Sequence, residues 1–238
     1  MALLIVWQSA LSLRLVNPIL FPPPLATLSQ VFTDASSGAL NLDAWATVAR
    51  TAQAFGLAAL FGVPIGVMLG ASRALYESVE FVIDFFRSTP ASALIPLFLL
   101  LFGLSDANKI AIAGFAAFLA IVFGAAYGVM NARKTRVLAA RVMGVPTWRI
   151  FTDVLLMESL PEIIVALRNG VSIALVIVIV AEMFIGSEDG LGHRIIDAQQ
   201  VFNIKKMYAA ILVTGALGYC VNMLFLGFER RFVHWSGR

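Results

Sequence analysis

Long apolar runs separated by shorter polar segments dominate the chain. Five runs after residue 44 are long enough to cross a bilayer, which takes about 20 mostly apolar residues in a helix. They are residues 45–70, 79–102, 109–130, 160–185 and 207–228. Arg87 and Pro90 interrupt the second run. The pattern predicts five membrane-spanning helices.

The first segment, residues 1–16, is apolar but shorter than a full span. Arg14 limits its uncharged stretch, and it lacks the basic start and the small-residue cleavage site of a signal peptide. We expect a short first helix, or one clipped at its N-terminus, in which case the true start lies upstream of Met1. The fold class is then an all-α integral membrane protein of about six transmembrane helices, and residues 1–238 form a single transmembrane domain.

Four polar segments connect these runs. Residues 17–44 contain apolar side chains at helical spacing, which predicts a short interfacial helix. Residues 71–78 read as a tight polar turn, and residues 187–206 as a polar loop. Residues 131–158 are long and basic.

The composition agrees with a membrane protein. Hydrophobic residues make up 60% of the 238 residues and charged residues only 13%, whereas soluble domains are about half apolar and a quarter charged. The mean hydropathy is +0.90. These values exclude a soluble enzyme, a disordered chain and a disulfide scaffold. The net charge of +3 is small, and no basic stripe with interleaved aromatic residues predicts binding to nucleic acid.

Loop charges predict the orientation, because cytoplasmic loops carry more Lys and Arg. If residues 131–158 are cytoplasmic, the cytoplasmic side holds nine such residues: Arg73, Arg133, Lys134, Arg136, Arg141, Arg149, Arg230, Arg231 and Arg238. The opposite side holds five: Arg14, Lys109, Arg194, Lys205 and Lys206. Both termini are therefore expected in the cytoplasm.

The basic segment 131–158 predicts two short helices joined by a sharp turn. Gly144 suits the left-handed position that ends a helix, and Pro146 prevents its continuation. Thr135 and Thr147 are candidate N-caps of the two helices. A capping box of Ser159 and Glu162 predicts that the next span starts there.

Small residues in the first of these helices, Ala139 and Ala140, and Gly144 in the turn would let another surface approach closely. An amphipathic loop that rests on the lipid interface is the alternative interpretation. The order of residues then adds a resemblance. Ala139-Ala140, three residues, Gly144, nine residues and Val-Leu-Leu resemble the cytoplasmic coupling motif of ABC importer permeases. Leu138 stands where that family has Glu, and Met157 where it has Pro.

The resemblance extends along nearly the whole chain, to the nitrate, sulfonate, taurine and bicarbonate branch of that family. It is carried by Phe-Pro-Pro-Pro at 21–24, the glycine-rich helix at 62–70, the run from Arg87 to Pro96 followed by Phe-Gly at 102–103, Ala-Glu at 181–182, and Gly-Leu-Gly at 190–192. The order and spacing of these segments are more specific than any one of them.

The resemblance implies a type I ABC importer permease of the bacterial plasma (inner) membrane, which works by alternating access and carries a small anion. The implied partners are a second permease copy, two ATPase subunits and an extracytoplasmic solute-binding protein. ATP and Mg²⁺ would bind the ATPase, and this chain would need no cofactor or metal. The implied ATPase-coupling residues are Leu138, Ala139, Ala140, Met143, Gly144, Pro146 and Trp148.

Ionisable residues in the spans must face protein or water, because each costs roughly 2.5–3.5 kcal/mol at mid-bilayer on insertion scales. Asp84 and Arg87 are three apart and can neutralise each other. Arg50 is expected to snorkel from a helix end. Arg168 and Glu182 lie 14 residues apart on one helix, roughly 21 Å, so each needs another partner or a wet cavity.

The candidate residues of a translocation pathway are Arg87, Pro90, Arg168 and Glu182. Structural partners for Arg168 and Glu182 are the alternative, and the prolines are either hinges or static bends. Glycines spaced four apart, at 62, 66 and 70 and at 124 and 128, predict close packing between helices of the chain.

Two other function classes are weighed against the permease. One is an intramembrane enzyme that uses Glu182 or Asp84, which a neighbouring ATPase gene would argue against. The other is a channel or carrier that does not use ATP, which has no need of a docking helix. No phosphate-binding G-x-x-x-x-G-K-[ST] motif occurs, so the chain does not bind ATP in that way.

Overall fold

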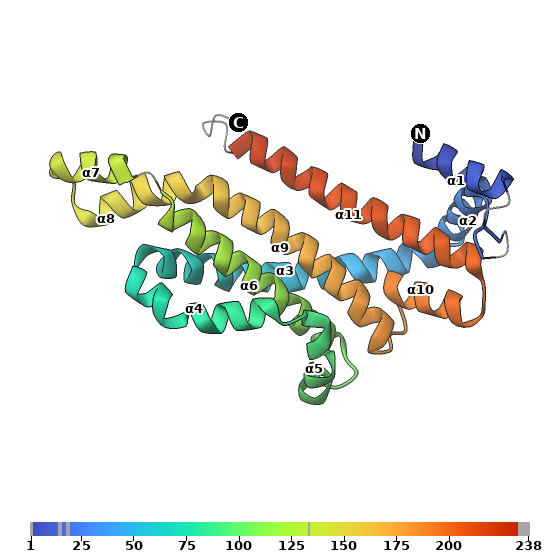
Figure 1. Cartoon of the computed structure of the whole chain (residues 1–238). Helices are drawn as coiled ribbons and strands as arrows, with labels where there is room; N and C mark the ends of the chain where they lie inside the picture. The colour runs from blue at the N-terminus through green and yellow to red at the C-terminus, as the bar shows by residue number, and fades with distance from the viewer. Residues whose placement is uncertain (1, 14–15, 18–19, 133, 233–238) are drawn as a thin grey trace.

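The computed structural model describes residues 2–13, 16–17, 20–132 and 134–232. These form an elongated bundle of helices, with α7 at one end and α10 at the other (Figure 1), and the described residues contain no β-strand. We refer to the α7 end and the α10 end below. Predictions that involve Met1, Arg14, Arg133 and Arg238 lie outside the described residues.

Four helices of the described chain are long and apolar enough to cross a membrane. They are α3 (Ala39–Ala71), α6 (Asp106–Met130), α9 (Leu156–Phe184) with the turns before it, and α11 (Ile204–Phe232). A fifth span is formed if the bent pair of α4 (Arg73–Ser88) and the segment Ala91–Phe102 counts as one, with a bend of 88°. All five predicted runs therefore coincide with these elements to within one residue, apart from the break at residues 89–90.

The N-terminal part holds two short helices. The helix α1 (Ala2–Ser12) is too short to count as a span, as its sequence predicts. The helix α2 (Pro24–Ser36) begins with Pro at its first position, where a missing N–H costs nothing, and it exposes Leu25 and Phe32. An amphipathic helix is thus present where the apolar spacing predicts one.

Helices α3, α6 and α9 form the centre of the bundle through small side chains. Ala54, Ala117 and Ala174 meet in a fully buried cluster. A Cβ added to Gly66 would lie 2.6 Å from the Val122 carbonyl oxygen, so α3 and α6 touch backbone to backbone. A Cβ on Gly124 would lie 2.4 Å from that of Ala166 on α9. The predicted close packing within the chain is confirmed.

Two polar segments contain more helix than their composition predicts. Residues 71–78 are not a tight turn, because α4 already begins at Arg73 after a single break at Ser72. The segment 187–206 contains α10 (Leu191–Gln200). Both helices carry charged residues at three- and four-residue spacings. These charges lower the mean hydropathy of the segments, so hydropathy alone predicts loops there.

The basic segment contains the predicted helix, turn and helix. After α7 (Lys134–Val142), Gly144 adopts a left-handed φ of +75°, and the chain becomes helical again in α8 (Thr147–Arg149). A π-helical stretch, Ile150–Leu155, then leads into α9 without a break.

The predicted caps are wrong. Thr135 and Thr147 lie inside their helices, and Pro146 is the N-cap residue of α8. The predicted start at Ser159 is also wrong, because its hydroxyl donates to the Leu156 carbonyl at 2.9 Å. Back-bonding to the preceding turn satisfies the hydroxyl within the helix, so no cap forms and α9 continues.

Candidate functional site

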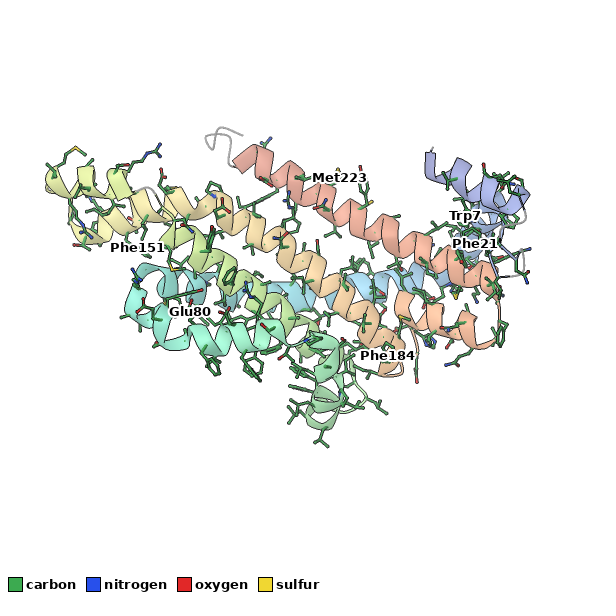
Figure 2. The ribbon with its side chains drawn as sticks, in the orientation of Figure 1. Trp7, Phe21, Glu80, Phe151, Phe184 and Met223 are labelled. Carbon is green, nitrogen blue, oxygen red and sulfur yellow. The ribbon has the colours of Figure 1, made fainter. Side chains whose placement is uncertain are left out.

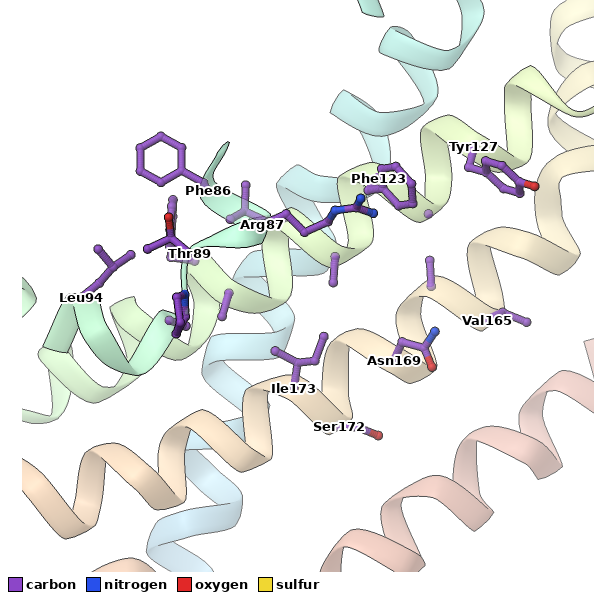
Figure 3. A pocket seen from close by; sticks show the side chains of 18 of the residues that line it. Phe86, Arg87, Thr89, Leu94, Phe123, Tyr127, Val165, Asn169, Ser172 and Ile173 are labelled. Atoms are coloured by element: carbon purple, nitrogen blue, oxygen red, sulfur yellow. The ribbon is translucent and has the colours of Figure 1, made fainter. Parts of the chain in front are cut away.

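A cavity of about 710 Å³ lies between α4, α6 and α9 (Figure 3). Most of its wall is apolar, with Phe, Ala, Leu and Ile side chains. Polar groups come from each of the three helices or their ends: Arg87 and Thr89, Tyr127, and Glu162, Asn169 and Ser172. Such a mixture, apolar walls with a few placed polar groups, is typical of binding cavities for small molecules.

Arg87 is the cation that reaches into this cavity. Its guanidinium carbon lies 4.0 Å from the centre of the Phe123 ring, a cation–π arrangement. Its Nη2 lies 3.5 Å from Asp84 Oδ1, one turn earlier on α4, and both side chains are about half exposed. The guanidinium therefore keeps donors free for a further partner.

The break in the second span places Arg87 at the cavity. Pro90 has no N–H and excludes the preceding residue from the helical region, so Thr89 is extended, with φ −81° and ψ 124°. The Thr89 amide donates to the Phe85 carbonyl at 3.1 Å, which closes the last turn of α4. Arg87 thus lies in the final turn of a helix that ends at the cavity wall.

A second polar cluster lies at the α10 end and is buried. Glu182 on α9 is fully buried and accepts hydrogen bonds from Thr47 Oγ1 at 2.9 Å and from Arg50 Nη1 at 2.8 Å. The Gly192 amide donates to the same carboxylate at 3.0 Å. Thr47 and Arg50 lie on α3 and Gly192 lies on α10, so Glu182 joins α3, α9 and α10.

Two glycines at the start of α10 fit closely against α9 and this carboxylate. A Cβ on Gly190 would lie 2.4 Å from Glu182 Cδ, and one on Gly192 would lie 2.2 Å from the Ile179 carbonyl oxygen. Gly190 also has a φ of +115°. Any larger residue at either position would displace α10 from α9.

Arg50 connects the cluster to further carboxylates. Its guanidinium lies 2.9 Å from Asp106 Oδ1 and also pairs with Asp189. Lys109 Nζ binds the same Asp106 oxygen at 3.1 Å and Ser187 Oγ at 2.9 Å. The buried cations are therefore all matched by carboxylates.

Arg194 on α10 forms a neighbouring pair of ion pairs. Its guanidinium contacts Asp34 and Asp43, each at 2.8 Å. Burial alone would lower the pKa of Arg194, but the hydrogen bonds to the two carboxylates outweigh it and raise the pKa above its usual range. Arg194 is therefore charged at every physiological pH and fastens α10 to α2 and α3.

The turn after α7 presents a surface of exposed side chains at the α7 end. Met143 has 74% of its surface exposed, and Leu138, Val142 and Trp148 are also exposed. Ala139 in the second half of α7, and Gly144 and Pro146 in the turn, are exposed as well. Ala140 differs, because it is buried, and its carbonyl accepts from the Val145 amide at 3.1 Å.

Two contacts hold this turn on the bundle. Arg136 on α7 forms an ion pair with Glu158 on α9. Ile150, the first residue of the π-helical stretch, is buried. A second cavity of about 870 Å³ lies between α7, the π-helical stretch and the start of α4, and Leu138 and Arg141 line it. The turn is thus attached to the bundle on one side and exposed on the other.

Comparison with known protein families identifies the chain. Residues 62–234 match the family described as "Binding-protein-dependent transport system inner membrane component". The chain belongs to this family. It is a permease subunit of an ABC importer, and it is a multi-pass membrane protein.

Relatives cover nearly the whole permease. A probable ABC transporter permease protein of Brucella abortus is 30% identical, covering 95% of this chain and 90% of its own. The taurine transport system permease protein TauC of Escherichia coli is 28% identical, covering 99% and 87%. The nitrate import permease protein NrtB of Synechocystis is 25% identical, covering 92% and 82%.

Solved structures show the same fold. A chain of the MetNI methionine ABC transporter, in an inward-facing conformation, matches with a TM-score of 0.71 and 22% identity, covering 83% of this chain and 98% of that chain. A chain of an amino acid ABC transporter matches with a TM-score of 0.67 and 18% identity, covering 84% and 97%.

The permease brings together only some of the residues that were candidates for its pathway. Arg87 and Pro90 both line the first cavity. Glu182 lies in the buried cluster at the α10 end instead. Arg168 faces away from the cavity, toward α11, where its Nη1 lies 3.3 Å from Glu229 Oε2. Arg168 and Glu182 therefore have the structural partners that were the alternative for them.

The expectation that Arg50 snorkels toward water is wrong. Arg50 is buried, with only 5% of its surface exposed, and it lies at the centre of the charged cluster. Its partners Asp106, Glu182 and Asp189 lie on α6, on α9 and in the loop before α10, far away in sequence. The sequence contains one signal for this cluster: the charged residues Arg50, Asp106 and Glu182 lie near the ends of three separate spans.

Thr47 and Phe123 were missed as well. Thr47 is fully buried, and its hydroxyl contacts Glu182 and accepts from the Leu191 amide at 2.9 Å. Phe123 supplies the ring beneath Arg87. Neither residue is conspicuous in the sequence, because a Thr or a Phe is common in an apolar helix. Among the described residues, no group of three His, Cys, Asp or Glu side chains is arranged to hold a metal ion.

Proposed function

We propose that this permease carries a small anion and that Arg87 is the group that attracts it. The guanidinium at the cavity wall is the observation that carries the proposal, because it is half exposed and only weakly paired with Asp84 at 3.5 Å. The names of two relatives support it, since taurine carries a sulfonate group and nitrate is itself an oxyanion. Arg binds such groups through several parallel hydrogen bonds.

The exposed turn around Gly144 is proposed as the docking site of a separate ATPase subunit. Leu138, Met143 and Trp148 support this, because large apolar side chains exposed together mark sites of protein association. The chain has no phosphate-binding motif of its own, so ATP and Mg²⁺ bind the partner. ATP binding in that partner would move the turn and thereby drive alternating access.

The proposed assembly contains two permease copies, two ATPase subunits and a solute-binding protein outside the membrane. The turn around Gly144 and the end of α11 lie in the cytoplasm, and the α10 end, where Trp7 of α1 packs on Tyr208, lies outside. The membrane is the bacterial plasma (inner) membrane. The loop charges support this orientation, because the positive-inside rule counts nine Lys and Arg residues on one side and five on the other.

Reconstitution of the complete transporter in liposomes tests the proposal. Nitrate, taurine, an alkanesulfonate and bicarbonate are supplied singly with the binding protein outside and ATP inside. We expect uptake of one of these anions that requires ATP, and no uptake of a neutral analogue of similar size. Uptake that continues with an inactive ATPase would favour a channel or carrier. Uptake of the neutral analogue alone would refute an anion pathway.

A further inference from the structure

Five charged side chains of α4 lie on one face of the helix. They are Arg73, Glu77, Glu80, Asp84 and Arg87, spaced by four, three, four and three residues. At about 100° per residue, these positions fall within an arc of about 80°. We call this set the charged stripe. It runs the length of α4, from its first turn to its last (Glu80 is labelled in Figure 2).

The other two faces of α4 have different surroundings. Tyr76 and Ile83 are buried and turn toward the bundle. Phe81 and Phe85 are 79% and 57% exposed, and their rings stack with centroids 6.4 Å apart. An exposed aromatic face on a membrane helix suits lipid. The charged stripe is thus separate from both the packed face and the lipid face.

The hydrocarbon of the bilayer is excluded as the surroundings of the stripe residues that lie within the predicted span 79–102, which are Glu80, Asp84 and Arg87. Each charge at mid-bilayer costs roughly 2.5–3.5 kcal/mol on insertion scales, so charged residues in spans face protein or a water-filled cavity. Within the stripe, Arg73 pairs with Glu77 at 2.7 Å and Arg87 with Asp84 at 3.5 Å. All four side chains are about half or more exposed, and exposed ion pairs add little stability. Stability alone gives no reason for the stripe.

The stripe connects the two cavities. Arg87 lines the cavity of about 710 Å³ between α4, α6 and α9. Arg73, Glu77 and Glu80 line the cavity of about 870 Å³ beneath the turn around Gly144. Asp84 lies between them on the same face. The sequence of charges along α4 therefore leads from the proposed anion site to the proposed ATPase docking turn.

We propose that the charged stripe is one wall of a water-filled passage from the Arg87 cavity to the cytoplasm, through which the solute leaves. The direction of travel rests on the proposed function, whereas the water-filled passage does not. On the cytoplasmic half, the cavity of about 870 Å³ is lined by two carboxylates, Glu77 and Glu80, and two guanidinium groups, Arg73 and Arg141. These charges balance, so this half of the passage is polar without a net charge that would hold an anion released from Arg87.

Reaction of single cysteines with a membrane-impermeant thiol reagent tests the passage. In a Cys220→Ser background, Glu80→Cys and Asp84→Cys report on the stripe, and Phe81→Cys and Phe85→Cys on the lipid face of the same helix turns. The full transporter is labelled in inside-out vesicles. We expect the stripe cysteines to react at least tenfold faster than the two controls. Denaturation in detergent should make all four react alike, which shows that each is present.

Two results would overturn the proposal. Equal reaction rates on both faces would mean that the stripe is no more accessible to water than the lipid face. Reaction at neither face of the folded transporter, with full reaction after denaturation, would mean that the stripe is buried against a second copy or another subunit. Failure of the proposed function is a separate result, because it is the absence of ATP-dependent anion uptake by the unlabelled protein.

Discussion

Arg50 Nη1 lies 2.8 Å from Glu182 Oε1, although 132 residues of chain separate the two side chains. The pair joins α3 to α9 at the α10 end. The helix that carries Glu182 is continuous with the turns that begin at Thr147, so one helical rod extends from the exposed turn around Gly144 to this buried pair. Displacement of the turn can therefore be transmitted along a single element.

Breaking this pair should be severely destabilising. Arg50→Met leaves the fully buried Glu182 without its cation, which costs about 3–5 kcal/mol for a buried pair. The double variant with Glu182→Gln should recover much of the loss, because Asp106 and Asp189 are half exposed and water can solvate them. Thermal unfolding of the purified variants in detergent measures both the loss of stability and its recovery.

The Arg168–Glu229 pair is the matched control for this prediction. Its side chains are 26% and 27% exposed and 3.3 Å apart, so Arg168→Met should cost about 1 kcal/mol or less. Equal losses for Arg50→Met and Arg168→Met would show that burial of the first pair does not matter to stability.

Two glycines of α3 should respond oppositely to alanine. A Cβ on Gly66 would lie 2.6 Å from the Val122 carbonyl oxygen, so Gly66→Ala forces α3 from α6 and should cost about 1–3 kcal/mol. Gly56 has nothing within 4 Å, so Gly56→Ala should be neutral or gain up to about 1 kcal/mol from helix propensity. The unfolding temperatures of the two variants test this prediction. A lower unfolding temperature for Gly56→Ala would contradict the open surroundings of Gly56.

Hydropathy predicted the spans because a membrane leaves the backbone few alternatives to a helix. The left-handed turn at Gly144 was also predictable, since Gly and Pro are local signals. The cluster around Arg50 was not, because its partners lie on other helices and periodicity gives no information about distant neighbours. The helix α10 was missed for a related reason: one of its buried residues, Arg194, is charged and is paired with Asp34 and Asp43 on other helices.

The orientation predicts which loops a thiol reagent can reach from outside the cell. In a Cys220→Ser background, Ser37→Cys reports on the α2–α3 junction and Thr135→Cys on α7, at opposite ends of the bundle (Figure 1). Ser37 is preferable to its neighbour Gly38, whose φ of +81° disfavours a side chain. An impermeant reagent on intact cells should label only Ser37→Cys. Labelling of Thr135→Cys instead would reverse the orientation.

Gly144→Val should uncouple the permease from its ATPase without removing it from the membrane. No atom lies within 4 Å of a Cβ at this position, so the effect comes from the φ of +75° and not from crowding. A branched residue there costs roughly 1–2 kcal/mol and favours another turn conformation. Solute uptake and solute-stimulated ATP hydrolysis should fall together at equal amounts of protein in the membrane.

Gly144→Asn is the control for that variant. Asn tolerates the left-handed region better than other side chains, so this variant should retain most of the coupling. Normal uptake by Gly144→Val would argue against the turn as the docking site, and equal loss in both variants would mean that the side chain, not the backbone conformation, is at fault.

The last prediction concerns Asp84 and Arg87, whose charged groups lie 3.5 Å apart at the edge of the cavity. If Arg87 only neutralises Asp84, then Asp84→Asn with Arg87→Gln removes both charges and should restore the uptake lost in either single variant. We expect no such rescue, because the Arg87 guanidinium faces the cavity over Phe123 and has donors left for a solute. The double variant should assemble normally and unfold within about 1 kcal/mol of the unmodified protein, since the pair is half exposed. Its uptake should nevertheless stay at least tenfold reduced, with the single variant Asp84→Asn less affected than Arg87→Gln. Uptake into liposomes is measured at solute concentrations that saturate the binding protein. Near-normal transport by the double variant would refute a role for Arg87 in the pathway.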